Sequence, residues 1–229
     1  MSFAPHSDFA VQKLTIGRDM APLLVIDNVV ADADELVELA ASKLFGDVAS
    51  YYPGVRAKAP LSYQQFVLTQ MRGLFSETFG LQSRTLRFTA CYFSLVTTPP
   101  EKLSHLQCIP HIDSVLGTEL AFIHYLFKGD HGGTAFYRHR STGFEVITQE
   151  RKLEYFETIE AERVGPDKPA VGYINGSTAL YEQVRSETGV FNRMLVYRRN
   201  SLHSGSIDPQ SAIDANPRTG RLSINGFMG

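Results

Sequence analysis

The sequence predicts a mainly β protein, a jelly roll that is preceded by supporting helices. Between residues 86 and 226, many short runs rich in β-branched and aromatic residues are punctuated by Gly, Pro and Asn, which is typical of a sandwich or barrel. Two segments with helical spacing of apolar residues come before these runs. Strands and helices do not alternate, and no Gly-rich phosphate loop is present, so a nucleotide-binding parallel sheet is not indicated.

The first third of the chain is expected to hold one strand and two helices. Residues 23–28 (LLVIDN) form a short apolar run that predicts a strand. Residues 32–45 follow a helical pattern that starts at an aspartate and has acidic residues in its first turn. Residues 62–79 carry apolar side chains at helical spacing and end before Gly80.

The rest of the chain is expected to be mostly strands. The predicted strands cover residues 86–97, 119–127, 130–139, 144–147, 170–175, 193–198 and 221–226. Residues 149–163 are charged and helix-like, and either a solvated surface helix or a substrate lid fits them. We therefore expect one domain over residues 1–229, in which residues 1–85 support a jelly-roll core of residues 86–229.

Composition excludes several classes of protein. With 22 basic and 24 acidic residues the net charge is −2, so no electrostatic footprint for nucleic acid exists. No apolar run approaches the roughly 20 residues that span a bilayer. The first residues lack the features of a signal peptide, and a cytoplasmic location is expected. Cys91 and Cys108 belong to no CxxC pair, so both are expected to be ordinary cysteines.

The sequence Pro110-His111-Ile112-Asp113 is the first candidate for chemistry. In an extended segment, residues i and i+2 face the same side, so His111 and Asp113 would present an imidazole and a carboxylate together. One further histidine would complete a site of two histidines and one carboxylate. Such a site suits Fe(II), because it leaves coordination positions open.

His203 is the preferred third ligand. It follows the strand expected over residues 193–198, and a jelly roll brings early and late strands together. The remaining histidines lie in a terminus, in a proline-bearing connection or within or beside predicted strands: His6, His105, His124, His131 and His139.

A second candidate site lies near the C-terminus. Arg221 and Ser223 share one face of the predicted strand over residues 221–226. A guanidinium offers two parallel donors to a carboxylate and a hydroxyl adds a third, so this face is suited to binding a carboxylate. Arg218, in the loop before this strand, is a competing candidate.

These motifs, in this order, resemble a known family. PHID, GGTAFY, NRMLVYRRNSLHSG and RLSIN are similar to the 2-oxoglutarate and Fe(II)-dependent dioxygenase superfamily, and look closest to a prolyl-hydroxylase-like bacterial branch with no assigned substrate. The resemblance covers roughly residues 86–229, together with the N-terminal strand and helix. It implies a double-stranded β-helix, a cupin-like jelly roll.

The resemblance also implies roles for individual residues. His111, Asp113 and His203 match the metal ligands, and no catalytic residue beyond them is expected. Arg221, with Ser223, matches the group that binds the distal carboxylate of 2-oxoglutarate. For a further cosubstrate contact on an early strand, we expect Tyr125, with Tyr92 as the alternative.

The resulting functional hypothesis is an Fe(II)- and 2-oxoglutarate-dependent oxygenase, a dioxygenase of the hydroxylase type that acts on a small molecule or a peptide side chain. A cosubstrate-independent cupin-type metalloenzyme, either a dioxygenase or an isomerase, is one alternative, and it predicts further histidines near the metal and no buried arginine. A non-catalytic jelly-roll binding module is the other alternative, which loss of a ligand would favour. Neither nucleic acid nor membrane is expected as a partner, and a homodimer is left open.

Overall fold

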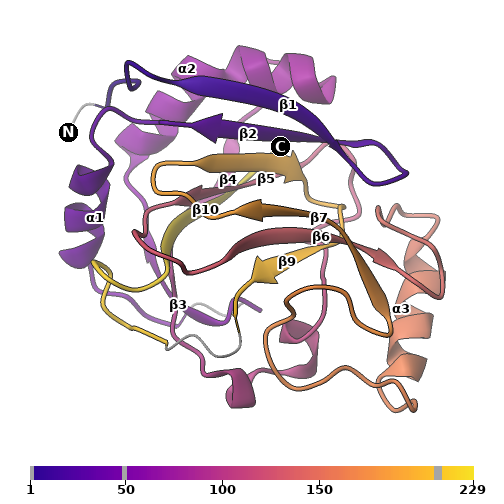
Figure 1. Ribbon diagram of the computed structural model, residues 1–229. Helices are drawn as coiled ribbons and strands as arrows, with labels where there is room; N and C mark the ends of the chain where they lie inside the picture. The colour runs from indigo at the N-terminus through magenta and orange to yellow at the C-terminus, as the bar shows by residue number, and fades with distance from the viewer. Residues whose placement is uncertain (1–2, 48–50, 209–212) are drawn as a thin grey trace.

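The fold is built on two antiparallel sheets (Figure 1). This computed structural model describes residues 3–47, 51–208 and 213–229; part of the loop between His203 and Arg221 thus lies outside the described residues. The strands of the large sheet are, in sheet order, β1 (Ala10–Ile16), β2 (Ala21–Asp27), β8 (Met194–Arg198), β5 (Leu120–Tyr125), β10 (Leu222–Met228), β4 (Phe88–Val96) and β3 (Gly54–Lys58). Those of the small sheet are β7 (Tyr181–Thr188), β6 (Gly133–His139) and β9 (His203–Ser206).

From β4 onward the chain winds between the two sheets. β4, β5, β8 and β10 lie in the large sheet, whereas β6, β7 and β9 lie in the small one. The short segment at His111 pairs with His203 at the free side of β9, which extends the small sheet by one bridge. This alternation is the winding of a jelly roll, so the predicted double-stranded β-helix is confirmed.

Helices cover the outer face of the large sheet. They are α1 (Ala33–Ala41) and α2 (Leu61–Phe79), whose apolar side chains join the outward-facing residues of β4, β5, β8 and β10 in one buried cluster. Asp32 caps α1 by accepting a hydrogen bond from the Glu35 amide at 3.0 Å. Gly80 ends α2 at a positive φ of 63°, where a glycine is least strained. No helix in the described ranges is long and apolar enough to cross a membrane.

The inner face of the large sheet differs from its outer face. In β10, Leu222 and Ile224 point to the helices, while Ser223 and Asn225 point toward the small sheet. The inner face is therefore polar along β10, whereas on β2, β5 and β8 it is mostly apolar and packs against Phe136 of the small sheet.

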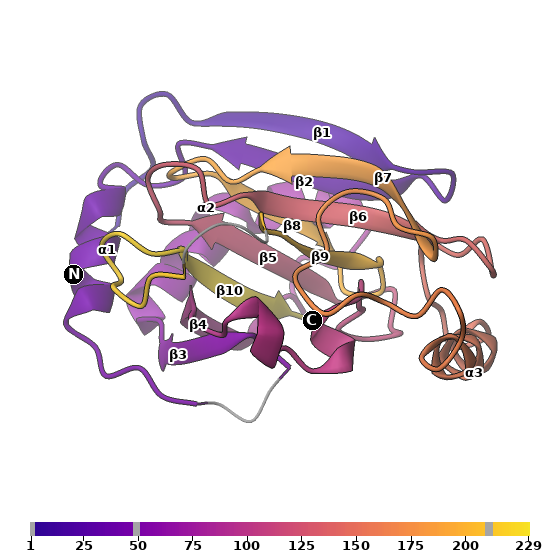
Figure 2. The ribbon, with the colours of Figure 1, turned by 60° about the horizontal axis from the view of Figure 1, so that its bottom comes forward.

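A third helix, α3 (Lys152–Glu162), lies in the connection between β6 and β7, at the opposite end of the molecule from α1 (Figures 1 and 2). Two short 3₁₀ helices, Pro100–Lys102 and His105–Gln107, precede the segment at His111. His139 of β6 holds α3 through a contact of 2.7 Å between its Nε2 and Glu162 Oε2.

Two predicted strands are wrong. Residues 144–147 contribute only a single bridge, between Val146 and Ser201. Residues 170–175 form a loop, in which Gly172 takes a positive φ of 142° that lies outside the range of a β-strand. In this loop the Gly172 amide donates to the Cys108 sulfur at 3.5 Å.

His124, on β5, belongs to the helix-covered core and not to the site between the sheets. Its ring lies between α2 and the turn before β8: Tyr63 Oη is 2.8 Å from Nδ1, and Asn192 Oδ1 is 3.1 Å from Nε2. Asn192 Oδ1 accepts, since it also accepts from the Val30 amide, so Nε2 carries the proton and Nδ1 accepts from Tyr63. Burial lowers the pKa of His124 to about 4.

We predict that His124 makes stability depend on pH. The unfolded chain takes up a proton on this histidine near its ordinary pKa of about 6.5, whereas the folded protein does so only near 4. The free energy of unfolding should therefore fall by about 2 kcal/mol between pH 6.5 and 4.5 because of this residue. Denaturant unfolding should show that His124→Gln is less stable than wild type at pH 7.5. Its free energy of unfolding should fall less than that of wild type between pH 6.5 and 4.5. Equal slopes for variant and wild type would contradict this role.

Candidate metal centre

The metal centre depends on one backbone bridge. The His111 amide donates to the His203 carbonyl at 2.9 Å, and the His203 amide donates to the His111 carbonyl at 3.0 Å. Residues paired in this way present their side chains on the same face of a sheet. The two imidazole rings accordingly lie 4.4 Å apart, centroid to centroid.

Asp113 completes a group of three. Candidate ligand atoms of His111, Asp113 and His203 all lie within 4.8 Å of one another. Asp113 is held by its amide, which donates to the Arg199 carbonyl at 2.8 Å, and its Oδ2 is 3.6 Å from His203 Nε2. Among the described residues this is the one group of three or more such side chains close enough to hold a metal ion.

The orientation of His203 fits metal binding. Its Nδ1 lies 2.9 Å from the Ser201 carbonyl, which can only accept, so Nδ1 carries the proton. Nε2, the nitrogen nearer Asp113, therefore presents its lone pair. A histidine whose second nitrogen donates to a carbonyl is the usual arrangement in metal sites. Two imidazoles and one carboxylate with an open side suit Fe(II).

The imidazole of His111 stays neutral over a wide pH range. Desolvation by the surrounding protein, together with His203, lowers its pKa to about 4. Asp113 opposes this shift and Arg56 adds to it. A neutral imidazole is the form that binds a metal.

Arg221 lies directly before β10 and is fixed by the turn before β6. Its Nε donates to the His131 carbonyl at 2.9 Å and its Nη2 to the Gly133 carbonyl at 2.7 Å. Gly132 makes this turn at a φ of 75°, and a Cβ there would lie 1.8 Å from the Ser206 carbonyl oxygen. These two bonds use part of the five donors of the guanidinium, so donors remain for a ligand.

Gly205 lies close to Arg221 and on the same strand as the candidate metal ligand His203. It lies two residues after His203 on β9, and so faces the same side of the small sheet. A Cβ at Gly205 would be 3.8 Å from Arg221 Nη2. The glycine thus leaves space beside the guanidinium.

Ser223 and Tyr125 lie side by side on the inner face of the large sheet, where they are paired in register. Ser223 Oγ donates to Asn225 Oδ1 at 2.6 Å. The hydroxyls of Tyr125 and Thr134, 2.7 Å apart, join the two sheets. Burial raises the pKa of Tyr125 to about 12, although the nearby Arg221 opposes the shift. The structure thus gathers Arg221, Ser223 and Tyr125 between the sheets.

The other candidates from the sequence lie elsewhere. Arg218 is exposed and pairs with Glu38 of α1 at 2.6 Å. His131 contributes a carbonyl, not its ring, to Arg221. His139 holds α3, as described above.

Arg56, on β3, is a residue of this site that the sequence analysis missed. It is paired in register with Ser94, which is in turn paired with Ser223, so all three face the small sheet. Its charge acts on both His111 and Asp113. Alternation in the short segment Gly54–Lys58 could have indicated a strand, but five residues after a Pro-Gly turn are a weak signal.

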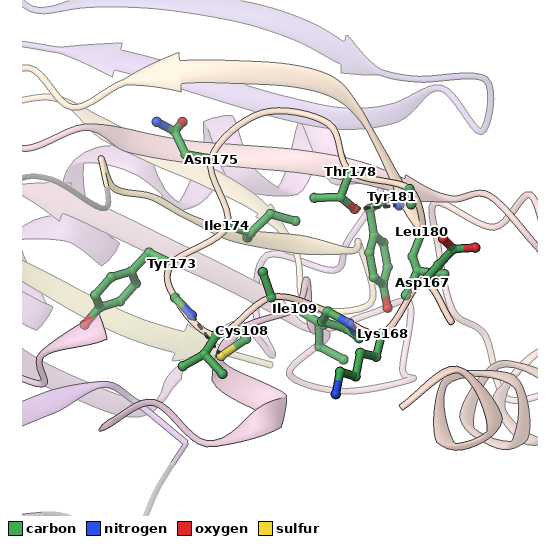
Figure 3. A pocket seen from close by; sticks show the side chains of 15 residues that line it. Cys108, Ile109, Asp167, Lys168, Tyr173, Ile174, Asn175, Thr178, Leu180 and Tyr181 are labelled. Atoms are coloured by element: carbon green, nitrogen blue, oxygen red, sulfur yellow. Dashed lines mark hydrogen bonds between the residues drawn. The ribbon is translucent and has the colours of Figure 1, made fainter. Parts of the chain in front are cut away.

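A cavity of about 380 Å³ lies beside the segment that leads into His111 (Figure 3). Cys108 and Ile109 form part of its wall, and the rest comes from residues 167–175 and 178–181. Cys108 is buried and free, as Cys91 is, and its sulfur accepts from the Gly172 amide at 3.5 Å. Tyr173, in the same wall, donates to the Thr98 carbonyl at 2.7 Å.

The fold and the site define a class: a double-stranded β-helix protein with a candidate metal centre of two histidines and one carboxylate between its sheets. The chain belongs to a family of unknown function, DUF6445, whose model matches residues 7–228. A search of curated proteins found no match.

Several solved structures are distantly similar to this chain. HygX from Streptomyces hygroscopicus, solved with nickel and 2-oxoglutarate, is 12% identical with a TM-score of 0.48, over 92% of this chain and 84% of HygX. The epimerase SnoN from nogalamycin biosynthesis is 14% identical with a TM-score of 0.45, over 86% and 70%. An N-substituted L-amino acid dioxygenase from Burkholderia ambifaria is 10% identical with a TM-score of 0.47, over 96% and 94%.

We predict that Asp113→Ala abolishes tight metal binding. The substitution removes the anionic ligand, and even loss of an outer hydrogen-bond partner typically costs a metal site about 10- to 100-fold in affinity. Titration of the apo-protein with Co(II), followed by its visible absorption, should show one site in wild type and at least about 100-fold weaker binding in the variant. Asp167→Ala, which removes an exposed aspartate elsewhere, is the control and should bind as wild type does. Unchanged affinity in Asp113→Ala would refute the site.

Proposed function

We propose that the protein is an Fe(II)- and 2-oxoglutarate-dependent oxygenase of the hydroxylase type, acting on a small molecule or a peptide side chain. The observation that carries this proposal is the placement of Arg221. Its oriented guanidinium lies next to Gly205, two residues along the same strand from His203. A dicarboxylate that binds the metal at one end could therefore pair with Arg221 at the other.

The candidate ligands fit Fe(II). His111, Asp113 and His203 would hold the ion on one side and leave its remaining positions for cosubstrate and oxygen. Iron and 2-oxoglutarate, when bound, supply the oxidising chemistry, and the protein supplies orientation and exclusion of water. Ser201, through its carbonyl, fixes the tautomer of His203 that this binding needs.

Arg221 would bind the distal carboxylate of 2-oxoglutarate, together with the hydroxyls around it. The guanidinium is buried and its known bonds are to neutral carbonyls, so its charge is not neutralised by them. Charge-assisted bonds to a carboxylate are roughly twice as strong as neutral ones. Ser223 and Tyr125 face the same space and would add neutral hydrogen bonds.

A cosubstrate-independent cupin-type metalloenzyme is less well supported. Such a site commonly uses more histidines, whereas the cluster among the described residues contains two, with one aspartate. A metalloenzyme without a cosubstrate would also not need a buried arginine beside the small sheet. A non-catalytic binding module would be favoured by a missing ligand, and none of the three is missing.

We predict that Arg221→Gln weakens 2-oxoglutarate binding and leaves metal binding intact. Loss of a charge-assisted pair of bonds corresponds to roughly 1.5–3 kcal/mol, or about 10- to 100-fold in dissociation constant. Calorimetric titration of 2-oxoglutarate into the Mn(II)-loaded protein measures this change. Arg218→Gln, the exposed competitor, should bind as wild type does; a weaker affinity in Arg218→Gln than in Arg221→Gln would reverse the assignment.

We also predict that the space at Gly205 is needed. A valine there would extend beyond the Cβ position that already lies 3.8 Å from Arg221 Nη2, into the space assigned to the cosubstrate. Gly205→Val should therefore bind Co(II) normally but lose more than about 10-fold in affinity for 2-oxoglutarate. Gly205→Ala is the matched control and should have a much smaller effect. Normal 2-oxoglutarate binding by the valine variant would mean that the cosubstrate lies elsewhere.

A further inference from the structure

Arg56 carries a charge that the proposed oxygenase site does not otherwise use. Its guanidinium lies over the ring of Tyr52, with 4.4 Å between Cζ and the ring centroid, and 5.8 Å from the centroid of Tyr92. Rings on which a guanidinium packs restrict its motion and stabilise its charge, but they leave its N–H groups without acceptors.

One donor of this guanidinium is buried without an acceptor. Among the described residues the Nε of Arg56 has no hydrogen-bond partner. Burial lowers the pKa of Arg56, which reflects the cost of removing a cation from water without a paired anion. An arginine with such a cost is suited to pair with an anionic group of a ligand.

The direction of Arg56 is toward the metal centre. Arg56 shares the inner face with Ser94 and Ser223, through the register of β3, β4 and β10. Asp113 is among the groups that act on its charge, and Arg56 in turn lowers the pKa of His111. A ligand at the metal would therefore meet this guanidinium.

The charge balance of the site favours one more anion. The two positive charges of the metal are outweighed by the three negative charges of Asp113 and 2-oxoglutarate, which leaves one negative charge. Arg221 and Arg56 together add two positive charges. One positive charge thus remains after the cosubstrate has bound. Other charged groups around the site are already paired: Arg185 with Glu187, Arg193 with Asp27 and Arg199 with Glu119.

We infer that Arg56 binds a carboxylate of the substrate, so that the protein acts on a small acid rather than on a neutral molecule. This inference rests on the proposed function, because it assigns 2-oxoglutarate to Arg221. A carboxylate fits better than a phosphate, since one guanidinium and one unbalanced charge match a monoanion. Tyr52 and Tyr92 would pack against the part of the substrate next to the carboxylate.

Matched pairs of acid and amide test this inference without knowledge of the substrate. The probes are benzoate and benzamide, pentanoate and pentanamide, and N-acetyl-L-phenylalanine and its amide. Each is added to the Mn(II)-loaded protein saturated with 2-oxoglutarate, and its dissociation constant is taken from the enhanced relaxation of its protons near Mn(II). The proteins are wild type, Arg56→Gln, Arg56→Lys and the control Lys58→Gln, which makes the same charge change two residues along the same strand.

Wild type and Lys58→Gln should bind at least one acid about 10-fold more tightly than its amide, as expected for a charge-assisted bond. Arg56→Gln should reduce this preference to less than about 2-fold while its affinity for Mn(II) and 2-oxoglutarate stays within about 2-fold of wild type. Arg56→Lys should retain part of the preference, because it keeps the charge.

Three results would overturn the inference. The first is a wild type that binds every acid and its amide equally well. The second is an Arg56→Gln variant that keeps the full preference for the acid. The third is an Arg56→Gln variant whose affinity for 2-oxoglutarate falls as far as that of Arg221→Gln, which would assign Arg56 to the cosubstrate. Failure of the proposed function has a different signature. In that case 2-oxoglutarate gives no relaxation enhancement that depends on Arg221, whereas the acid preference can still be measured.

Discussion

The pairing of His111 with His203 is the constraint on which the site depends. The two residues are far apart in the sequence, and two hydrogen bonds between their backbones bring their imidazoles to one side of the small sheet. The jelly-roll winding makes this pairing available, because it places an early segment at the free side of β9. Asp113 then follows at the spacing of an extended chain, and the Arg199 carbonyl holds its amide.

The same winding explains why the site has a polar floor. Each strand of the large sheet contributes apolar side chains to the helix-covered core on one face and can place polar ones on the other. Arg221, Ser223 and Tyr125 use that inner face, and Thr134 of the small sheet closes the space above them. The helices α1 and α2 stabilise the sheet without contributing to this floor.

Much of this arrangement could be predicted from the sequence, since it follows from local period-two patterns. The motifs around His111 and Arg221 alternate visibly, and their order matched a known winding. β7 was missed because YEQVRSET, at an edge of the small sheet, is mostly polar and lacks an alternating apolar face. Residues 170–175 are apolar enough for a strand, but Gly172 takes a positive φ of 142° there, which the sequence alone does not show. Arg56 was missed for a related reason: its importance comes from register with Ser94, not from its neighbours in sequence.

An optical measurement tests most directly whether one site holds both a metal and 2-oxoglutarate. Fe(II) and 2-oxoglutarate are added in turn to the anaerobic apo-protein, and the visible charge-transfer absorption of the ternary complex is recorded. We expect a weak band that appears only when both are present and that saturates at one equivalent of iron per chain. Bound iron without any such band, at saturating 2-oxoglutarate, would contradict the account.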